Sequence, residues 1–274
     1  MASIYALSDI HGCLKALDEA LVLVDLDSDR ENKLIFCGDY IDYGPQSCET
    51  YSKIRDLTRQ SPTQVIALRG NHDQMFLDFL LADDEDVMGA EWLNADKDFA
   101  TIRSFLSPTA RKVFDGQTGF LDTDGLFRAA KMTREDINAH HPGLIQWLRN
   151  LPFHCETDTQ IFVHAGIDEE AEDLWAVGTS DECFLSKYPP TFGAFYKDII
   201  AGHVGTPSIR NGKDDHSVYW DGLSHYYIDG GTANSGAVPV LKYDTVSRKY
   251  SSFHKSADCG ENAKWTEYSI LKEE

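Results

Sequence analysis

The sequence predicts an α/β fold that begins with three parallel strands. Three short apolar runs, at residues 4–8, 34–37 and 64–68, each pass directly into a polar turn. The turns are regularly spaced, because Asp39 follows Asp9 by 30 residues and Asn71 follows Asp39 by 32. About 30 residues is the length of a strand, a crossover helix and the next strand. We therefore expect neighbouring strands whose carboxyl ends meet at one edge, where open α/β sheets bind their ligands.

The segments between these strands have helical patterns. In residues 13–26 the apolar positions Leu14, Leu17, Leu21 and Val24 recur at intervals of three and four, which is typical of an amphipathic helix. Pro45 precedes a second helix expected at residues 46–59, in the position where proline is tolerated.

The region after the third strand is expected to be a helical insertion. Helical patches occur at residues 75–81, 101–105, 134–137 and 144–148, with little strand pattern between them. No Gly-, Ser- or Pro-rich linker bounds the region, which argues against a separately folding unit. We predict a single domain over residues 1–274 with an insertion over about 75–151 that caps one side of the sheet.

Strand patterns dominate the second half of the chain. Short loops separate most of these runs, which predicts antiparallel strands added to the parallel start. The expected strands are residues 159–163, 198–201, 217–220, 225–228, 238–243 and 250–254.

Composition limits the classes of partner. The 274 residues carry a formal charge of −20, and the Lys and Arg clusters that bind nucleic acid backbones are absent. No apolar run is long enough to span a membrane, and the first strand begins too early to leave room for a signal peptide. Six cysteines lack paired spacing, which favours free thiols. We expect a soluble, cytoplasmic protein that binds neither nucleic acid polymers nor membranes.

Metal-ligating residue types recur where the predicted strands end. His164 and His203 follow apolar runs just as Asp9 and Asp39 do, although a single histidine in such a place is more often structural. Mixed oxygen and nitrogen donors without a thiolate suit Mn, Fe or Zn. Six donors exceed one four-coordinate site, so two metal ions that share Asp39, on the middle strand, are expected. The predicted ligands are Asp9, His11, Asp39, Asn71, His164 and His203.

Five ordered motifs contain these residues: Asp9-Ile10-His11-Gly12, Gly38-Asp39-Tyr40-Ile41-Asp42, Gly70-Asn71-His72-Asp73, His164-Ala165-Gly166 and Gly202-His203. In order and spacing they resemble the motifs of the phosphoprotein phosphatase family of dinuclear metallophosphoesterases. Its bacterial branch includes Ser/Thr phosphatases and symmetrical diadenosine tetraphosphatases.

The resemblance implies a four-layer αββα sandwich of the calcineurin-like type, with mixed sheets and the metal ions at its rim. It implies that one metal is held by Asp9, His11, Asp39 and His203. The other metal would be held by Asp39, Asn71 and His164.

The chemistry expected from this resemblance is direct hydrolysis of a phosphoester. Two divalent ions, Mn being expected and Fe or Zn being alternatives, can bind a bridging hydroxide that attacks phosphorus in line. His72 would act as general acid for the leaving oxygen, and Asp42 would pair with His72 and favour its charged form. The alternative for this pair is a salt bridge at a strand end with no catalytic part.

Two arginines that grip phosphate in the family are missing here. Tyr43 stands where family members usually carry arginine, and a phenol supplies neither the charge nor the bidentate fork. The arginine that many relatives carry shortly after a tryptophan is also absent, because the first basic residue after Trp175 is Lys187. Tyr43 could still donate one hydrogen bond. Arg69 is a candidate substrate contact or a structural ion pair, and Arg103 and Arg210 are further candidates.

Three functions follow from these observations. The leading hypothesis is a metal-dependent hydrolase of phosphomonoesters whose expected substrate is a Ser/Thr phosphoprotein. The second is a nucleotide hydrolase of the symmetrical diadenosine tetraphosphatase type, because Asp73 and the Ile167 that follows the histidine motif resemble that branch. The third is a catalytically impaired metal-binding interaction module, which the missing arginines favour and the complete ligand set opposes.

Overall fold

The computed structural model describes residues 2–84, 86, 89–90, 92–93, 97–116, 123–255 and 264–271, and its strands form two mixed sheets. In spatial order, the first sheet contains β11 (Trp265–Ser269), β10 (Lys249–Lys255), β9 (Leu241–Asp244), β1 (Ser3–Leu7), β2 (Lys33–Phe36) and β3 (Val65–Ala67). The second sheet contains β4 (His154–Glu156), β5 (Gln160–Val163), β6 (Asp198–Ala201), β8 (His225–Tyr227) and β7 (Tyr219–Trp220).

The predicted parallel start is confirmed. β1 pairs with β2 and β2 pairs with β3, both in parallel, so β2 is the middle strand of the three. In the register of the sheet, Leu7 pairs with Phe36, and Phe36 pairs with Ala67. The polar turns that follow these strands therefore meet at one edge of the sheet.

The expectation of an antiparallel second half is wrong for the strands that matter most to the site. β5, β6 and β8 are parallel to one another, while β4 and β7 are antiparallel strands at the two edges of their sheet. Among the strands that the structure describes, β9, β10 and β11 form an antiparallel run that extends the first sheet. The segment between β5 and β6 is long enough for a crossover connection, and sequential loops do not reveal which strands pair. The short strands β4 and β11 were not predicted.

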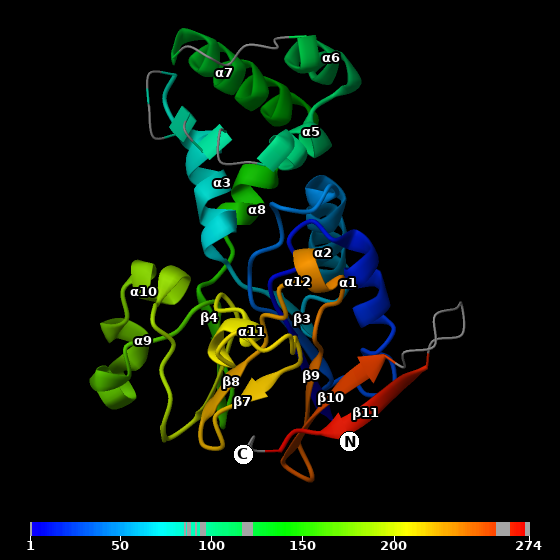
Figure 1. Cartoon of the computed structure of the whole chain (residues 1–274), viewed down its shortest axis with the longest axis vertical. Helices are drawn as coiled ribbons and strands as arrows, with labels where there is room; N and C mark the ends of the chain where they lie inside the picture. The colour runs from blue at the N-terminus through cyan, green and yellow to red at the C-terminus, as the bar shows by residue number, and fades with distance from the viewer. Residues whose placement is uncertain are drawn as a thin grey trace.

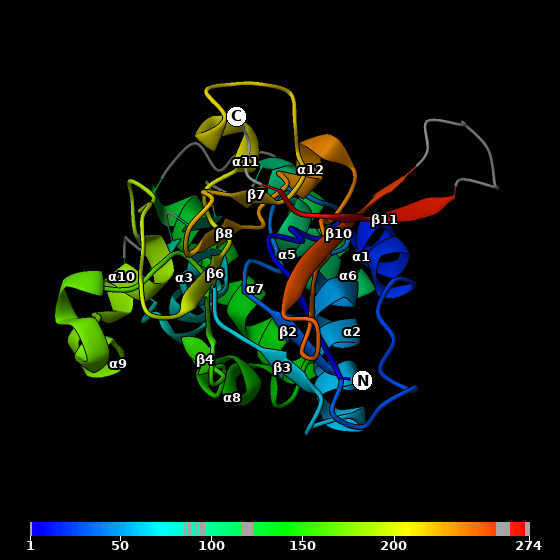
Figure 2. The same cartoon turned by 90° about the horizontal axis from the view of Figure 1, so that it is seen from below.

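Side chains alternate between the two faces of each sheet. Each sheet therefore packs against the other sheet on one face and against helices on the other, which gives four layers. In β1, Leu7 faces a cluster with α1 (Leu14–Leu21) and α2 (Ser47–Gln60), whereas Ala6 faces the second sheet, where it shares a cluster with Phe162 and Ile200. On the outer face of the second sheet, Ile161 and Val163 share a cluster with Trp175 of α9 (Trp175–Gly178) and Phe184 of α10 (Asp181–Ser186). The short helix η2 (Glu169–Leu174) precedes α9. Figures 1 and 2 show α1 and α2 on one side of the sheets and α9 and α10 on the other. The predicted αββα sandwich is confirmed.

Helices from the middle of the chain form a lobe beyond the sheets (Figure 1). Phe76 of this lobe lies 6.1 Å from Tyr51 of α2, ring centre to ring centre, and 4.9 Å from Phe105. The lobe and α2 thus share one hydrophobic cluster. The division into one domain with an insertion over residues 75–151 stays a prediction. The helices are α3 (Asn71–Leu81), η1 (Lys97–Phe99), α5 (Ala100–Phe105), α6 (Pro108–Gly116), α7 (Thr123–His140) and α8 (Leu144–Arg149).

Two short helices complete the fold, α11 (Thr206–Ile209) after β6 and α12 (Thr232–Ser235) after β8. Within the described part of the chain, no helix combines the length and the apolar character that crossing a bilayer requires.

Candidate metal centre

The loops that leave β1, β2 and β6 turn sharply into the site. Asp9, His11, Asp39 and His203 all have left-handed backbone conformations, with φ between 49° and 63°. Such conformations are uncommon for residues other than glycine and concentrate at functional sites. They direct side chains from separate strands toward one point at the rim of the sandwich.

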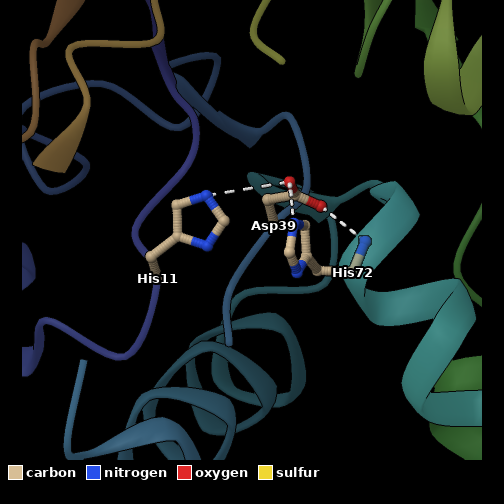
Figure 3. Close-up of side chains that lie close together, drawn as sticks. All are labelled: His11, Asp39 and His72. Carbon is tan, nitrogen blue, oxygen red and sulfur yellow. Dashed lines mark hydrogen bonds and ion pairs between the residues drawn. The ribbon is translucent and has the colours of Figure 1, made fainter. Parts of the chain in front are cut away.

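One group of donors surrounds Asp39 on the side of β1. The Nε2 atom of His11 lies 3.9 Å from Asp9 Oδ1 and 3.8 Å from Asp39 Oδ2. The Nδ1 atom of His11 is 2.7 Å from the carbonyl oxygen of Ile41, which can only accept a hydrogen bond. His11 therefore carries its proton on Nδ1 and turns the lone pair of Nε2 toward the two carboxylates. Figure 3 shows Asp39 between His11 and His72.

A second group lies on the other side of Asp39. Asn71 Oδ1 is 2.8 Å from His164 Nε2 and 3.1 Å from His203 Nδ1, and His164 Nε2 is 3.5 Å from Asp39 Oδ2. The ring of His203 thus lies with Asn71 and His164, whereas only its backbone N–H contacts Asp9, at 3.1 Å from Oδ2. This grouping differs from the one that the resemblance implies, which placed His203 with Asp9 and His11.

The second group fits a cation. His164 Nδ1 lies 2.9 Å from the carbonyl oxygen of Cys37, so its proton is there and Nε2 is an acceptor. This acceptor faces another acceptor, Asn71 Oδ1, at 2.8 Å. Two lone pairs at that distance repel each other, and a metal ion bound by both atoms removes the repulsion.

Electrostatics favour the same conclusion. Burial raises the pKa of Asp39 to about 8 and the pKa of Asp9 well above its usual range, so a nearby cation is needed to keep both ionised at neutral pH. Burial lowers the pKa of His11 to about 4 and that of His164 well below its usual range. The imidazoles are therefore neutral, which is the form that binds metals. The donor set suits divalent transition metal ions.

His72 and Asp42 form a pair beside these donors. His72 Nδ1 is 2.6 Å from Asp42 Oδ2, and the hydroxyl of Thr101 donates to Asp42 Oδ1 at 2.7 Å. Burial opposes the charged form of His72, but the hydrogen bond with Asp42 and the charge of Asp39 raise its pKa to about 9. His72 is therefore protonated at neutral pH, and it lines the cavity described below.

Asp73 holds the loops of the metal site in place through hydrogen bonds. Its fully buried carboxylate accepts the backbone N–H groups of Asp39, at 2.9 Å, and Gly70, at 2.8 Å, together with the hydroxyl of Tyr51 at 2.8 Å. Asp73 thus ties the loops after β2 and β3 to α3 and α2. This role was not predicted.

Arg69, a candidate for either a substrate contact or a structural role, makes structural contacts here, and its part in substrate binding stays a prediction. The guanidinium of Arg69 donates to the carbonyl oxygens of Leu148 and Arg149, at 2.9 and 2.8 Å, and to Gln74. These contacts anchor the end of α8, and among the residues that the structure describes they include no ion pair.

The donors open into a cavity of about 560 Å³ that the side chain of Tyr43 borders. Asp229 and Asn234 were missed in the sequence, although Asp229 follows β8 as Asp9 and Asp39 follow β1 and β2. The criterion that identified the other ligands, a metal-ligating residue type directly after a predicted strand, would therefore also have identified Asp229. The cavity is lined by Asp9, His11, Asp39, Tyr43, Asn71, His72, His203, Asp229, Gly231, Ala233 and Asn234.

An αββα sandwich with clustered Asp, Asn and His donors at its rim defines a metallophosphoesterase-like protein. A model of the calcineurin-like phosphoesterase family matches residues 2–221, and the chain belongs to this family. The family generally uses a dinuclear divalent metal centre, and the donor groups described above are its candidate ligands.

Two curated relatives illustrate what the chain is similar to. A symmetrical bis(5'-nucleosyl)-tetraphosphatase of Coxiella burnetii is 37% identical over 198 residues, which are 72% of this chain and 53% of the relative. A protein of the same name from Janthinobacterium sp. is 25% identical over 195 residues, 71% of this chain and 55% of the relative. The chain therefore spans about half the length of these relatives.

Solved structures support the fold. The cold-active protein-tyrosine phosphatase of a psychrophilic Shewanella species aligns with a TM-score of 0.55 and 17% identity. The alignment covers 91% of this chain and 77% of the phosphatase.

Proposed function

We propose that the chain hydrolyses phosphoester bonds at a dinuclear metal centre. The observation that carries this proposal is the placement of donor groups on both sides of Asp39, next to the pair formed by His72 and Asp42. Asp9 and His11 would complete one metal site with Asp39. The other site would use Asp39 together with Asn71, His164 and His203, whose ligand atoms converge.

The residues of the chain have distinct parts in this proposal. Two divalent ions, when bound, activate water and neutralise phosphoryl oxygens. His72, protonated at neutral pH, donates the proton that the leaving oxygen requires. Asp42 fixes the tautomer of His72 through the contact with Nδ1, and Thr101 fixes the orientation of Asp42.

Several finer assignments stay predictions. The curated relatives favour the nucleotide hydrolase hypothesis over a Ser/Thr phosphoprotein phosphatase. These predictions are manganese as the bound metal, a phosphomonoester as the substrate and a cytoplasmic location. The complete ligand set and the acid pair argue against an impaired binding module.

A panel of metals and substrates tests the proposal. The protein, stripped of metal and reloaded with Mn, Fe, Zn or Mg, would be assayed with 4-nitrophenyl phosphate, bis(4-nitrophenyl) phosphate and diadenosine tetraphosphate. We expect turnover with at least one metal, and its loss in Asp39→Asn and in excess chelator. Metal binding without turnover of any substrate would instead support the binding module.

A further inference from the structure

Helix α5 of the lobe contacts the first residues of α2 through hydroxyl groups (Figure 1). The first N–H groups of a helix have no acceptor inside that helix, and the side chain of Gln46, which precedes α2, supplies none. Ser104 of α5 supplies one instead, because its hydroxyl oxygen accepts the N–H of Cys48 at 3.0 Å. The proton of the same hydroxyl goes to the carbonyl oxygen of Thr101. The lobe therefore caps α2.

Three hydrogen bonds next to this cap form a closed ring that begins and ends at Asp42. Thr101 has one hydroxyl proton, which goes to Asp42 Oδ1 at 2.7 Å because a carboxylate only accepts. In the 3.2 Å contact between the hydroxyls of Ser47 and Thr101, Ser47 is therefore the donor. The oxygen of Ser47 in turn accepts the backbone N–H of Asp42 at 3.3 Å. The same two hydroxyls thus hold both the backbone and the side chain of Asp42.

Asp42 depends on this support. Its backbone φ of 71° is left-handed, which is uncommon for a residue other than glycine. Its Oδ2 contacts His72 and its Oδ1 accepts from Thr101. Ser47 and Thr101 are fully buried, so water does not simply replace a hydroxyl that is removed. Without the hydroxyl of Thr101, the carboxylate would lose the donor that sets its orientation toward His72.

Ser47, Thr101 and Ser104 are not among the described residues that line the cavity. Their hydroxyls reach the site through Asp42. We propose, on the basis of the proposed function, that the contact between α5 and α2 positions the general acid. Thr101 and Ser47 are positioning residues that hold the carboxylate of Asp42, and Ser104 keeps α5 where Thr101 can reach it. Movement of α5 away from α2 would stop proton donation without changing the metal ligands.

Two substrates of nearly the same shape test the proposal. We would measure kcat for a phenyl ester and a 4-nitrophenyl ester of the phosphoester class that the protein hydrolyses, since 4-nitrophenolate needs little protonation. Thr101→Val removes the hydroxyl and should lower kcat by at least about tenfold for the phenyl ester and by less than about twofold for the 4-nitrophenyl ester. KM should not change. Thr101→Ser, which keeps a hydroxyl, should restore most of the rate.

Ser104→Ala tests the part of the lobe, because Ser104 does not contact Asp42. It should lower kcat several-fold for the phenyl ester and leave the 4-nitrophenyl ester nearly unaffected. Thr133→Val is the matched control in α7, because this threonine is equally buried and its hydroxyl has no hydrogen-bond partner among the described residues. Its kcat should equal that of the wild type for both esters. An unchanged phenyl ester rate in Thr101→Val or Ser104→Ala would overturn the proposal.

A double-mutant cycle separates positioning from a structural role. In the His72→Asn background the general acid is gone, so Thr101→Val should cause no further loss of kcat with the phenyl ester. The same loss in both backgrounds would show that Thr101 acts on the fold and not through His72, and it would overturn the proposal.

If the wild-type protein hydrolyses no ester, the proposed function fails, and NMR spectroscopy still decides the positioning. In the Zn-loaded protein with isotopically labelled histidine, the Nδ1 proton of His72, assigned with His72→Asn, should exchange slowly with water because Asp42 accepts it. Thr101→Val and Ser104→Ala should speed this exchange by at least about tenfold, and Thr133→Val should not. An unchanged exchange rate in Thr101→Val would contradict the positioning role.

Discussion

The carboxylate of Asp42 lies 2.6 Å from Nδ1 of His72, and this contact orients the imidazole. Among the described histidines that line the cavity, His72 alone has a raised pKa. Two of the other histidines, His11 and His203, have lowered pKa values because they are buried without such a partner. One chain thus contains neutral imidazoles suited to metal binding and a protonated one suited to acid catalysis.

The first prediction concerns Asp42. Asp42→Asn should lower kcat by about 100-fold, because the amide neither favours the charged form of His72 nor fixes its tautomer. Metal content, measured by mass spectrometry of the protein, should not change, since Asp42 is not among the proposed ligands. The loss should be larger for an alkyl leaving group than for 4-nitrophenolate, which needs little protonation. An equal loss for both groups would show that Asp42 does not act through the general acid.

The second prediction concerns metal binding and stability. Mn should raise the melting temperature of the stripped protein, because a cation relieves the repulsion among Asp9, Asp39 and Asp229 in the buried site. Free metal at 100 times its Kd contributes about 2.7 kcal/mol. Asp39→Asn should abolish most of this rise. Asp78→Asn on α3 removes an exposed carboxylate outside the cavity, so it should respond to Mn as the wild type does. A normal response of Asp39→Asn would exclude Asp39 as the shared ligand.

The third prediction concerns Asp73. Asp73→Ala should lower the free energy of unfolding by about 3 kcal/mol or more, because it leaves the buried donors of Gly70, Asp39 and Tyr51 without an acceptor. Urea unfolding of the metal-free protein measures this cost apart from any effect on metal binding. Asp78→Ala is the matched control on the same helix and should cost little. A cost for Asp73→Ala below about 1 kcal/mol would contradict the supporting role.

The sequence was most informative about the metal-ligating residues that directly follow the ends of strands. Asp9, Asp39 and Asn71 could be placed together because regular spacing predicts parallel strands, and parallel strands end at one edge. Pairing in the second half could not be predicted, because a loop length does not identify which neighbour a strand joins. The orientation of Arg69 was equally inaccessible, since its partners are carbonyl oxygens of α8, about 80 residues away along the chain.

The fourth prediction concerns the pH dependence of stability on the outer face of the second sheet. Buried His225 lies 3.2 Å from Glu169 and 3.1 Å from Asp221. Burial alone would raise the pKa of Glu169, but hydrogen bonds from His225 and Thr191 lower it to about 2, so its stabilising effect is lost as the pH falls from its ordinary pKa toward 2. Burial opposes the charge of His225, but Glu169 and Asp221 raise its pKa above 6.5, so its effect is lost as the pH rises through that raised value.

Glu169→Gln should therefore destabilise the protein most between about pH 4.5 and 6.5, by about 1 to 2 kcal/mol, and less at pH 3 or 9. Urea unfolding at these pH values measures the difference. The neighbouring Glu170→Gln changes an exposed carboxylate and should show no such maximum. A destabilisation that is the same at every pH would indicate a packing effect instead.

The fifth prediction concerns Gly70, whose backbone passes directly beside Asp39. A β-carbon at position 70 would overlap both Oδ1 and the backbone nitrogen of Asp39, and neither can move without displacing the shared ligand. Gly70→Ala should therefore weaken metal binding by at least about tenfold, which corresponds to roughly 1.4 kcal/mol. Gly116→Ala, at a position with no atom within 4 Å of the added carbon, should bind metal normally. Calorimetric titration with Mn distinguishes the two variants. Equal affinities would mean that Asp39 can shift without loss, and the rigid strand-end geometry would then not be what defines the metal centre.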